Sequence, residues 1–256
     1  MDSALNNALI IAASVVAAIA FLFVVTRTST APARKESNDF TGAVVAVIGT
    51  TYAVILAFTL SGVWTMFQEA QKNEEQEANA LVNIYRIAGL LDSDNAAQIR
   101  TLCLRYGQHV VQQEIHTLET GALTPEGSAM VDEFWRLAGQ ARVHGERDDI
   151  NVYQLTEELR LLTQYRRIRA LNGREELPAI LWAVLIAGGV ITVAASCFFG
   201  VPSFRFHLLQ VMVLSLLIAL VLVAIADIDR PYQGVVKVQP EGFRYALQTL
   251  GNDGSP

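Results

Sequence analysis

The chain has 256 residues, a net charge of −6 at pH 7 and 52% hydrophobic residues, and its mean hydropathy is +0.33. This composition is too apolar for an ordinary soluble protein, and the apolar residues are concentrated in blocks. The acidic balance and the lack of a basic patch argue against nucleic acid as a partner. Cys103 and Cys197 lie in a polar and an apolar stretch respectively, so the sequence predicts neither a disulfide framework nor a metal site.

Four apolar blocks are long enough to cross a bilayer. They are Ala4–Val25, Phe40–Phe67, Leu177–Phe199 and Leu208–Ala226. The first block lacks a basic start and a small-residue cleavage site, so we interpret it as a span rather than a removable signal. The sequence therefore predicts an all-α polytopic membrane protein with four transmembrane helices. A helical extramembrane domain is expected between the second and the third of them.

The predicted organisation has four parts. Membrane helices one and two occupy residues 1–67, the extramembrane domain 68–176, membrane helices three and four 177–227, and a C-terminal tail 228–256. A short loop, TRTSTAPARKESND, is expected between the first two spans. Basic residues near the span ends favour a cytoplasmic domain and cytoplasmic termini under the positive-inside rule.

The second block continues past the membrane with helical periodicity. Apolar and small residues recur at three- and four-residue steps, and Glu77 falls on the same stripe as Leu81 and Tyr85. This pattern predicts one continuous helix that leaves the membrane as a stalk. Glu74 and Glu75, by contrast, are expected on a solvated face of that stalk.

Two faces of the second span differ in composition. One is a ridge of small residues that would let neighbouring helices approach closely: Gly49, Ala53, Ala57 and Ser61. The other mixes hydroxyl groups with bulky apolar groups: Thr51, Ile55, Phe58, Gly62 and Thr65. This second face is typical either of a pore lining or of a contact with another span. In a pore, Ile55 and Phe58 would form a constriction that gates by dewetting.

Charged residues follow the second span and precede the third. Glu69 and Glu77 would form acidic rings if several copies of the stalk stood around an axis. Arg166 and Arg169 suit either a juxtamembrane face or an anion-attracting vestibule. The four residues together make up the predicted charged vestibule.

Four further helices are expected outside the spans. Their expected positions are Asn95–Thr120, capped by Asp92 to Asn95, then a helix starting at Thr124-Pro125, one from Asp148-Asp149 to Leu171, and Glu241–Leu250. Glu114 lies on the apolar stripe of the first of these helices. A buried carboxylate needs a partner, and Arg86 or Arg105 is the expected one. A structural ion pair of Glu114 with Arg86 is therefore predicted rather than a catalytic acid.

The usual signatures of catalysis are missing from the sequence. It contains no phosphate-binding glycine loop, no His/Cys cluster with metal-ligand spacing and no Gly-x-Ser-x-Gly motif. We therefore expect no enzyme activity, no cofactor and no bound metal.

Several segments together resemble one known family. They are EANALVNIYR at Glu77–Arg86, YGQHVVQQE at Tyr106–Glu114, RRIRALNGREELPAILW and DIDRPYQGVVKVQP. In combination they resemble the bestrophin-like domain family (DUF4239), over residues 52–247. One departure is Ile115, where a typical member has Trp. The resemblance implies a four-span helical membrane protein. It also implies a distant kinship to true bestrophins, which are pentameric anion channels whose second span lines the pore.

The sequence and the resemblance favour an oligomeric ion channel of the bacterial inner membrane. The expected partners are membrane lipid, further copies of the chain in a homo-oligomer such as a pentamer, and inorganic anions. The alternative is a membrane-anchored sensor or scaffold without transport activity, because paired spans that flank a helical bundle also occur in chemoreceptors. No output module such as a kinase or cyclase supports that alternative.

Overall fold

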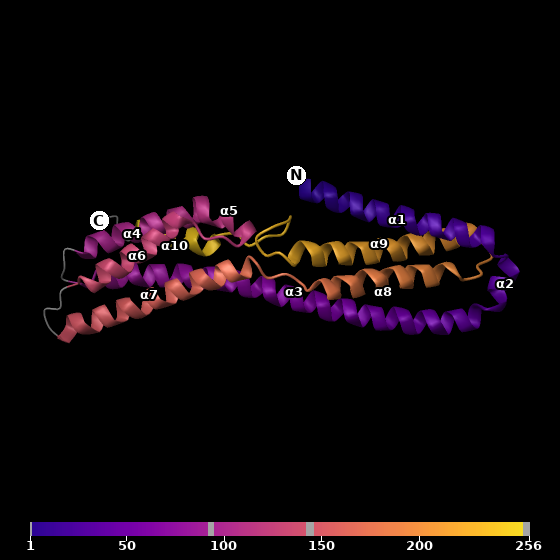
Figure 1. Ribbon diagram of the computed structural model, residues 1–256, viewed down its shortest axis with the longest axis horizontal. Helices are drawn as coiled ribbons and strands as arrows, with labels where there is room; N and C mark the ends of the chain where they lie inside the picture. The colour runs from indigo at the N-terminus through magenta and orange to yellow at the C-terminus, as the bar shows by residue number, and fades with distance from the viewer. Residues whose placement is uncertain (1, 92–94, 142–145, 253–256) are drawn as a thin grey trace. The chain divides into compact units, whose positions relative to one another are not determined.

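The computed structural model describes residues 2–91, 95–141 and 146–252, in which helices are the only regular secondary structure (Figure 1). The longer helices are α1 (Asp2–Thr28), α3 (Asn38–Ala88), α4 (Asn95–His109), α6 (Pro125–Gly139), α7 (Glu146–Asn172), α8 (Ala179–Cys197), α9 (Phe204–Ile228) and α10 (Glu241–Asn252). The short ones are α2 (Ala31–Glu36), the π-helical turn η1 (Val110–Glu114), α5 (Ile115–Thr117) and the 3₁₀ turn η2 (Leu118–Thr120).

The chain divides into two compact units, and α3 contributes residues to both. The apolar unit consists of Met1–Thr65, Glu176–Asp229 and Gly234–Val236, and the polar unit of Met66–Glu175, Arg230–Gln233 and Lys237–Pro256. Within the described residues, four helices are long and apolar enough to cross a membrane: α1, α3, α8 and α9. The predictions of an all-α chain and of four such helices are confirmed.

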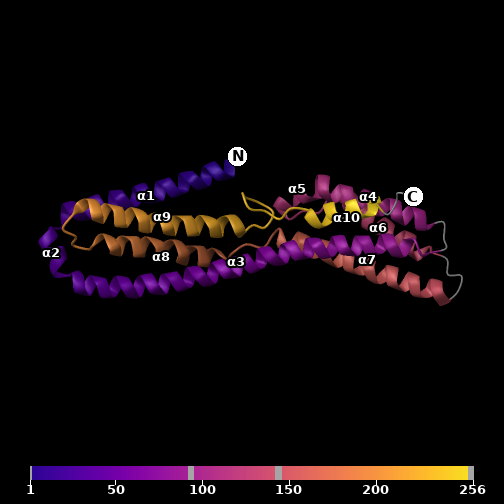
Figure 2. The ribbon, with the colours of Figure 1, turned by 180° about the vertical axis from the view of Figure 1, so that it is seen from behind.

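In the apolar unit, α1, α8 and α9 lie alongside one another (Figures 1 and 2). Leu22 and Val25 of α1 are buried against Val211 of α9 and Cys197 of α8. A second cluster joins Val63 of α3 to residues of α8 and α9. At the opening of α3, the Asn38 side chain accepts from the backbone N–H of Gly200, at 2.8 Å, and donates to its carbonyl, at 3.1 Å.

The segment between the first two apolar helices departs from the predicted loop. It contains α2, a helix of six residues with a proline in its first turn. Proline is well tolerated there because the first N–H groups of a helix have no intrahelical acceptor and its fixed φ suits a helix. Residues 31–36 of the predicted short loop therefore form a helix.

Tyr52 of α3 packs across two consecutive glycines of α8. Its hydroxyl donates to the Leu185 carbonyl oxygen at 2.9 Å, and its ring covers Gly188. A Cβ atom at Gly188 would lie 2.5 Å from the ring, closer than real contacts allow. The Tyr52 side chain can approach the α8 backbone only because this position carries no side chain.

We expect Gly188→Ala to destabilise the protein by about 1–3 kcal/mol, because the new methyl group forces Tyr52 out of its place. The measurement is thermal unfolding of the purified protein in detergent. Gly139→Ala in α6 is the control, since a Cβ there would have no neighbour within 4 Å. Equal melting temperatures for the two variants would contradict the packing argument.

The polar unit is built around the part of α3 that follows the apolar segment. Leu81, Ile84 and Ala88 of α3 are buried among side chains of α4, α6, α7 and α10. Phe134 of α6 and Phe243 of α10 are fully buried in the same cluster. The expected single helix across the apolar and the polar sequence is confirmed, since α3 runs unbroken for 51 residues. The cap expected at Asp92–Asp94 lies outside the described residues.

Candidate functional site

A network of charged side chains occupies the interior of the polar unit. Glu77, Glu114 and Arg169 are 0% exposed and Arg166 is 6% exposed. They come from α3, the turn η1 and α7, so three segments distant in sequence meet at one point. Charges at this depth persist only when they are paired and hydrogen-bonded.

Arg169 joins the two glutamates. Its Nε donates to Glu77 Oε2 at 2.6 Å, and its Nη2 donates both to Glu77 Oε1 at 3.0 Å and to Glu114 Oε1 at 2.7 Å. The Tyr106 hydroxyl of α4 donates to Glu77 Oε1 at 2.5 Å. Because a single guanidinium bonds both carboxylates, Arg169 connects α3 and η1 to α7.

Glu114 has a second arginine partner. Arg166 donates from Nε to Glu114 Oε1 at 3.2 Å and from Nη2 to Oε2 at 2.9 Å. The guanidinium groups of Arg166 and Arg169, both on α7, thus bind the same carboxylate of Glu114. Glu114 closes the π-helical turn η1, in which one extra residue widens the helix. Such turns are frequent at functional sites.

Thr124 connects the network to the start of α6. Its hydroxyl accepts from the backbone N–H of Gly127 at 3.1 Å, which caps the helix, and donates to Glu114 Oε2 at 2.7 Å. His109 Nε2 lies 2.6 Å from the same hydroxyl. Since the hydroxyl has only one proton and gives it to Glu114, His109 must be the donor, with its proton on Nε2.

The network fixes the protonation states of Glu114 and Arg169. Burial alone would raise the pKa of Glu114, but the charges of Arg169 and Arg166 and the bond from Thr124 outweigh it and lower that pKa below its ordinary value. Burial alone would lower the pKa of Arg169, but Glu77, Tyr106 and Glu114 raise it well above its ordinary value. Glu114 is therefore ionised, and Arg169 charged, at neutral pH.

A third carboxylate of α3 lies one turn before Glu77. Glu74 is 0% exposed and accepts from the backbone N–H groups of Gly242, at 3.2 Å, and Phe243, at 3.0 Å. It thereby satisfies two amides at the start of α10 from outside that helix. The expectation that Glu74 lies on a solvated face was wrong, because the C-terminal helix covers it. Glu75 is exposed, as expected.

Two buried donors of the polar unit are left without a hydrogen-bond partner among the described residues. They are Arg169 Nη1 and the Tyr232 hydroxyl. The described residues also contain no group of three or more His, Cys, Asp or Glu side chains arranged to hold a metal ion. The network consists of ion pairs and hydrogen bonds that join α3, η1 and α7.

The structure corrects the predicted partner of Glu114. Glu114 is bonded to Arg166 and Arg169 of α7, whereas Arg86 is exposed on α3. The expected pair of Glu114 with Arg86 was therefore wrong. Arg86 faces away from the apolar stripe of α3, and its side chain does not enter the interior that encloses Glu114.

Three of the four predicted vestibule residues are buried instead. Arg169 is paired with Glu77 and Arg166 with Glu114 inside the polar unit, so these residues cannot form a solvated charged ring. Only Glu69 is exposed. A signal for this arrangement was present in the sequence. Arg166 and Arg169 continue the spacing of Leu155, Leu159 and Leu162, which places both arginines on the buried stripe of α7.

The predicted pore-lining residues lie in the apolar unit, on α3. Phe58 is 76% exposed, and Thr51, Gly62 and Thr65 are also exposed. Ile55 differs, because it is half-buried and packs beside Val63, Leu185 and Ile225. The small residues Ala53, Ala57 and Ser61 are exposed too. The other helices of this chain thus cover neither the small-residue ridge nor the face around Phe58.

The sequence of this chain matches the model of one known protein family. A model of the bestrophin-like domain matches residues 12–243, which is most of the chain. The chain belongs to the bestrophin-like family. The resemblance expected from its sequence motifs is thereby confirmed. Among curated proteins, no match to this bestrophin-like chain was found.

Solved structures share the fold of this bestrophin-like chain. One is a variant of a bacterial bestrophin homologue from Klebsiella pneumoniae, with a TM-score of 0.73 and 12% identity over 96% of this chain and 99% of the other. A second, described as a membrane protein, has a TM-score of 0.70 and 13% identity over 96% and 99%. A further structure of the Klebsiella pneumoniae homologue has a TM-score of 0.68 and 13% identity over 94% and 95%. At such identities the likeness establishes the fold alone.

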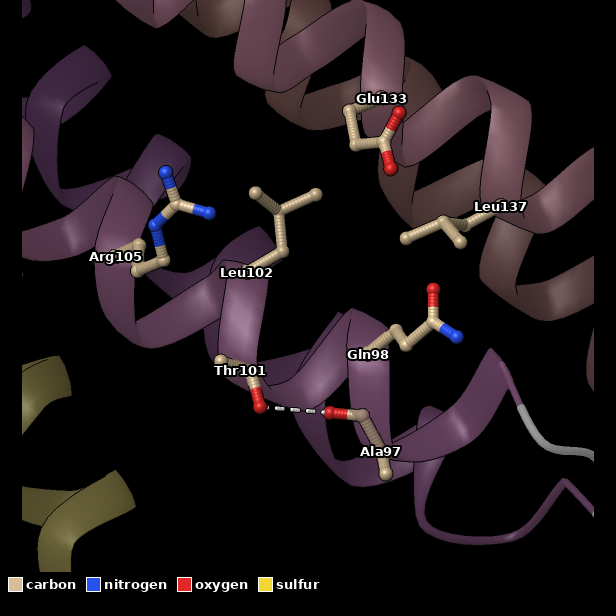
Figure 3. A pocket seen from close by; sticks show the side chains of 7 residues that line it. All are labelled: Ala97, Gln98, Thr101, Leu102, Arg105, Glu133 and Leu137. Carbon is tan, nitrogen blue, oxygen red and sulfur yellow. Dashed lines mark hydrogen bonds between the residues drawn. The ribbon is translucent and has the colours of Figure 1, made fainter.

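The bestrophin-like chain also has an open hollow between α4 and α6, with a volume of about 340 Å³ (Figure 3). Leu102 and Leu137 form its apolar part, with Gln98, Arg105 and Glu133 around them. The Glu133 carboxylate is already held at 2.7 Å by Nε of Arg136 on its own helix. One of the two charged groups that line the hollow is therefore already engaged within α6.

Proposed function

We propose that the chain assembles into a homo-oligomeric ion channel, with α3 as the wall of a central pore. The observation that carries this proposal is the uncovered face of α3, where Phe58 is 76% exposed beside the exposed residues Thr51, Gly62 and Thr65. Membership of the bestrophin-like family supports the same function. An aromatic ring on a helix face that no other helix of its chain covers is expected to contact another subunit, to contact lipid or to line a pore on a symmetry axis.

The composition of α3 suits a ring of copies. Ala57 and Phe58 are consecutive, so their side chains point about 100° apart around the helix. The small-residue ridge, with Ala53, Ala57 and Ser61, would then contact a neighbouring copy, and the Phe58 face would turn to the axis. Since Ile55 is half-buried within its own chain, Phe58 alone forms the constriction in this proposal. A ring of phenylalanines would close the pore by dewetting.

The proposed channel conducts inorganic anions across the inner membrane of a bacterium, as the family relationship suggests. Arg166 and Arg169 do not contribute to its selectivity, because they are committed to buried glutamates. In this proposal the membrane parts are residues 1–67 and 177–227, with the domain of residues 68–176 and the tail of residues 228–256 in the cytoplasm. Reversal potentials measured in chloride gradients test the anion preference.

We expect Phe58→Ala to raise the conductance of the purified protein in planar bilayers severalfold, because removing the ring widens the narrowest point. Phe206→Ala is the matched control, since Phe206 is a similarly exposed phenylalanine on α9. It should conduct as the wild type does. The oligomeric state in detergent should be a closed ring. A monomer or dimer with no current, for both wild type and Phe58→Ala, would favour a sensor or scaffold instead.

A further inference from the structure

The first turn of α10 is held against α3 by the buried side chain of Glu74. Phe243, Ala246 and Leu250 anchor α10 in the apolar core of the polar unit. The amides of Gly242 and Phe243 are satisfied by the Glu74 carboxylate. A Cβ at Gly242 would lie 2.8 Å from Glu74 Oε2, so the first turn of α10 rests directly on this side chain.

Glu74 has no ion-pair partner among the described residues, although charged groups surround it. Arg169 of α7 acts on it from a distance but donates its bonds to Glu77 and Glu114. On α10, Arg244 is bonded to Glu241. On α3 itself, Glu77 repels Glu74, and the exposed Glu75 is its direct neighbour. The buried Tyr232 also interacts with Glu74.

In the polar unit, the charges of the buried glutamates and arginines do not balance when every carboxyl is ionised. Glu74, Glu77 and Glu114 would supply three negative charges, against two positive charges from Arg166 and Arg169. Among these three carboxylates the two arginines form ion pairs with Glu77 and Glu114, so the excess charge resides on Glu74. A proton on Glu74 removes that excess without disturbing either ion pair.

We propose that Glu74 is a pH-sensitive contact that holds the first turn of α10 against α3 when it is neutral and releases that turn when it ionises. Two effects oppose each other at this carboxyl. The amides of Gly242 and Phe243 favour the ionised form, because an ionised carboxylate is the better acceptor. Burial and the charge of Glu77 favour the neutral form.

Burial is the largest of these effects and raises the pKa of Glu74 from 4.5 to about 7, despite the bonds from Phe243 and Gly242. When the turn leaves α3, water reaches the carboxyl and its pKa returns toward the ordinary value. The docked state therefore binds a proton that the undocked state has lost. Docking is strongest below about pH 4.5, weakens by up to tenfold per pH unit as the pH rises, and becomes constant above about pH 7.

Hydrogen–deuterium exchange of the full-length protein in detergent tests the proposal, through a peptide that covers residues 242–250. Wild type and Glu74→Gln are compared at the same pH, which cancels the intrinsic pH dependence of exchange. Glutamine keeps a carbonyl acceptor but cannot ionise. We expect the ratio of wild-type exchange to Glu74→Gln exchange to rise at least about tenfold between pH 5 and pH 8.

Glu75→Gln is the matched control, because it removes the neighbouring, exposed carboxylate of the same helix. It should follow the wild type at every pH. A constant ratio between wild type and Glu74→Gln from pH 5 to pH 8 would overturn the proposal. Should Glu74→Gln fail to fold, the wild type alone decides. The proposal is then overturned if the exchange of the α10 peptide, relative to a peptide of α4, does not change with pH.

Discussion

Replacing Arg169 with methionine should lower the free energy of unfolding of the polar unit by about 3–5 kcal/mol. Methionine fills a similar volume but leaves Glu77 and Glu114 buried without the guanidinium that joins them. Arg166 still neutralises Glu114, whereas Glu77 retains only the bond from the Tyr106 hydroxyl. An uncompensated buried carboxylate is therefore the main source of the expected loss.

Denaturant unfolding in detergent, followed by circular dichroism, measures this change. Arg167→Met is the matched control, since Arg167 is an exposed neighbour on the same helix, and it should alter stability by less than about 0.5 kcal/mol. Adding Glu77→Gln to Arg169→Met should restore part of the loss, because it removes the stranded charge. If Arg169→Met is as stable as Arg167→Met, the network does not hold the unit together.

Gly127→Ala should also be strongly destabilising, by about 3 kcal/mol. A Cβ at this position would lie 2.1 Å from Glu114 Oε2 and 2.7 Å from Arg166 Nη2. Neither atom can retreat without breaking the bond that joins them, so the new methyl group separates the carboxylate from its partner. The cost adds overpacking to the loss of a buried, charged hydrogen bond.

The same substitution at the other end of α6 provides the control. Gly139 lies in the last turn of the helix, and a Cβ there would have no neighbour within 4 Å. Gly139→Ala should therefore be neutral, or should stabilise by up to about 1 kcal/mol, because alanine favours the helix. Thermal unfolding of the two variants side by side checks the difference. Similar melting temperatures would mean that the network adapts to the extra methyl group.

Helix positions could be predicted from the sequence because they depend on local patterns. Apolar blocks of bilayer length identify α1, α3, α8 and α9. The three- and four-residue steps through Leu81 and Tyr85 predict that α3 continues beyond its apolar part. Thr124 followed by Pro125 gives the start of α6 in the same way, since the cap is encoded by neighbouring residues.

Partners distant in sequence could not be predicted in this way. Glu74 accepts a hydrogen bond from the amide of Gly242, 168 positions away, and no local sequence pattern predicts that contact. The burial of Glu114 followed from its stripe, but the choice of Arg166 and Arg169 over Arg86 depends on which helix faces it. Five arginines in the second half of α7 and just after it suggested a juxtamembrane face or an anion-attracting vestibule: Arg160, Arg166, Arg167, Arg169 and Arg174. Only the register with Leu159 and Leu162 separates the two buried arginines from the others.

The π-helical turn η1 makes the network depend on the conformation of the backbone as well as on the identity of the side chains. A turn of this kind corresponds to an α-helix into which one residue has been inserted, and it absorbs that residue so that the helix on either side keeps its orientation. If η1 relaxed to an ordinary α-helix with all of its residues retained, Glu114 would rotate by about 100° away from Arg169. Such a change in the coiling of one turn would abolish the ion pairs of Glu114 while every charged side chain of the network is retained.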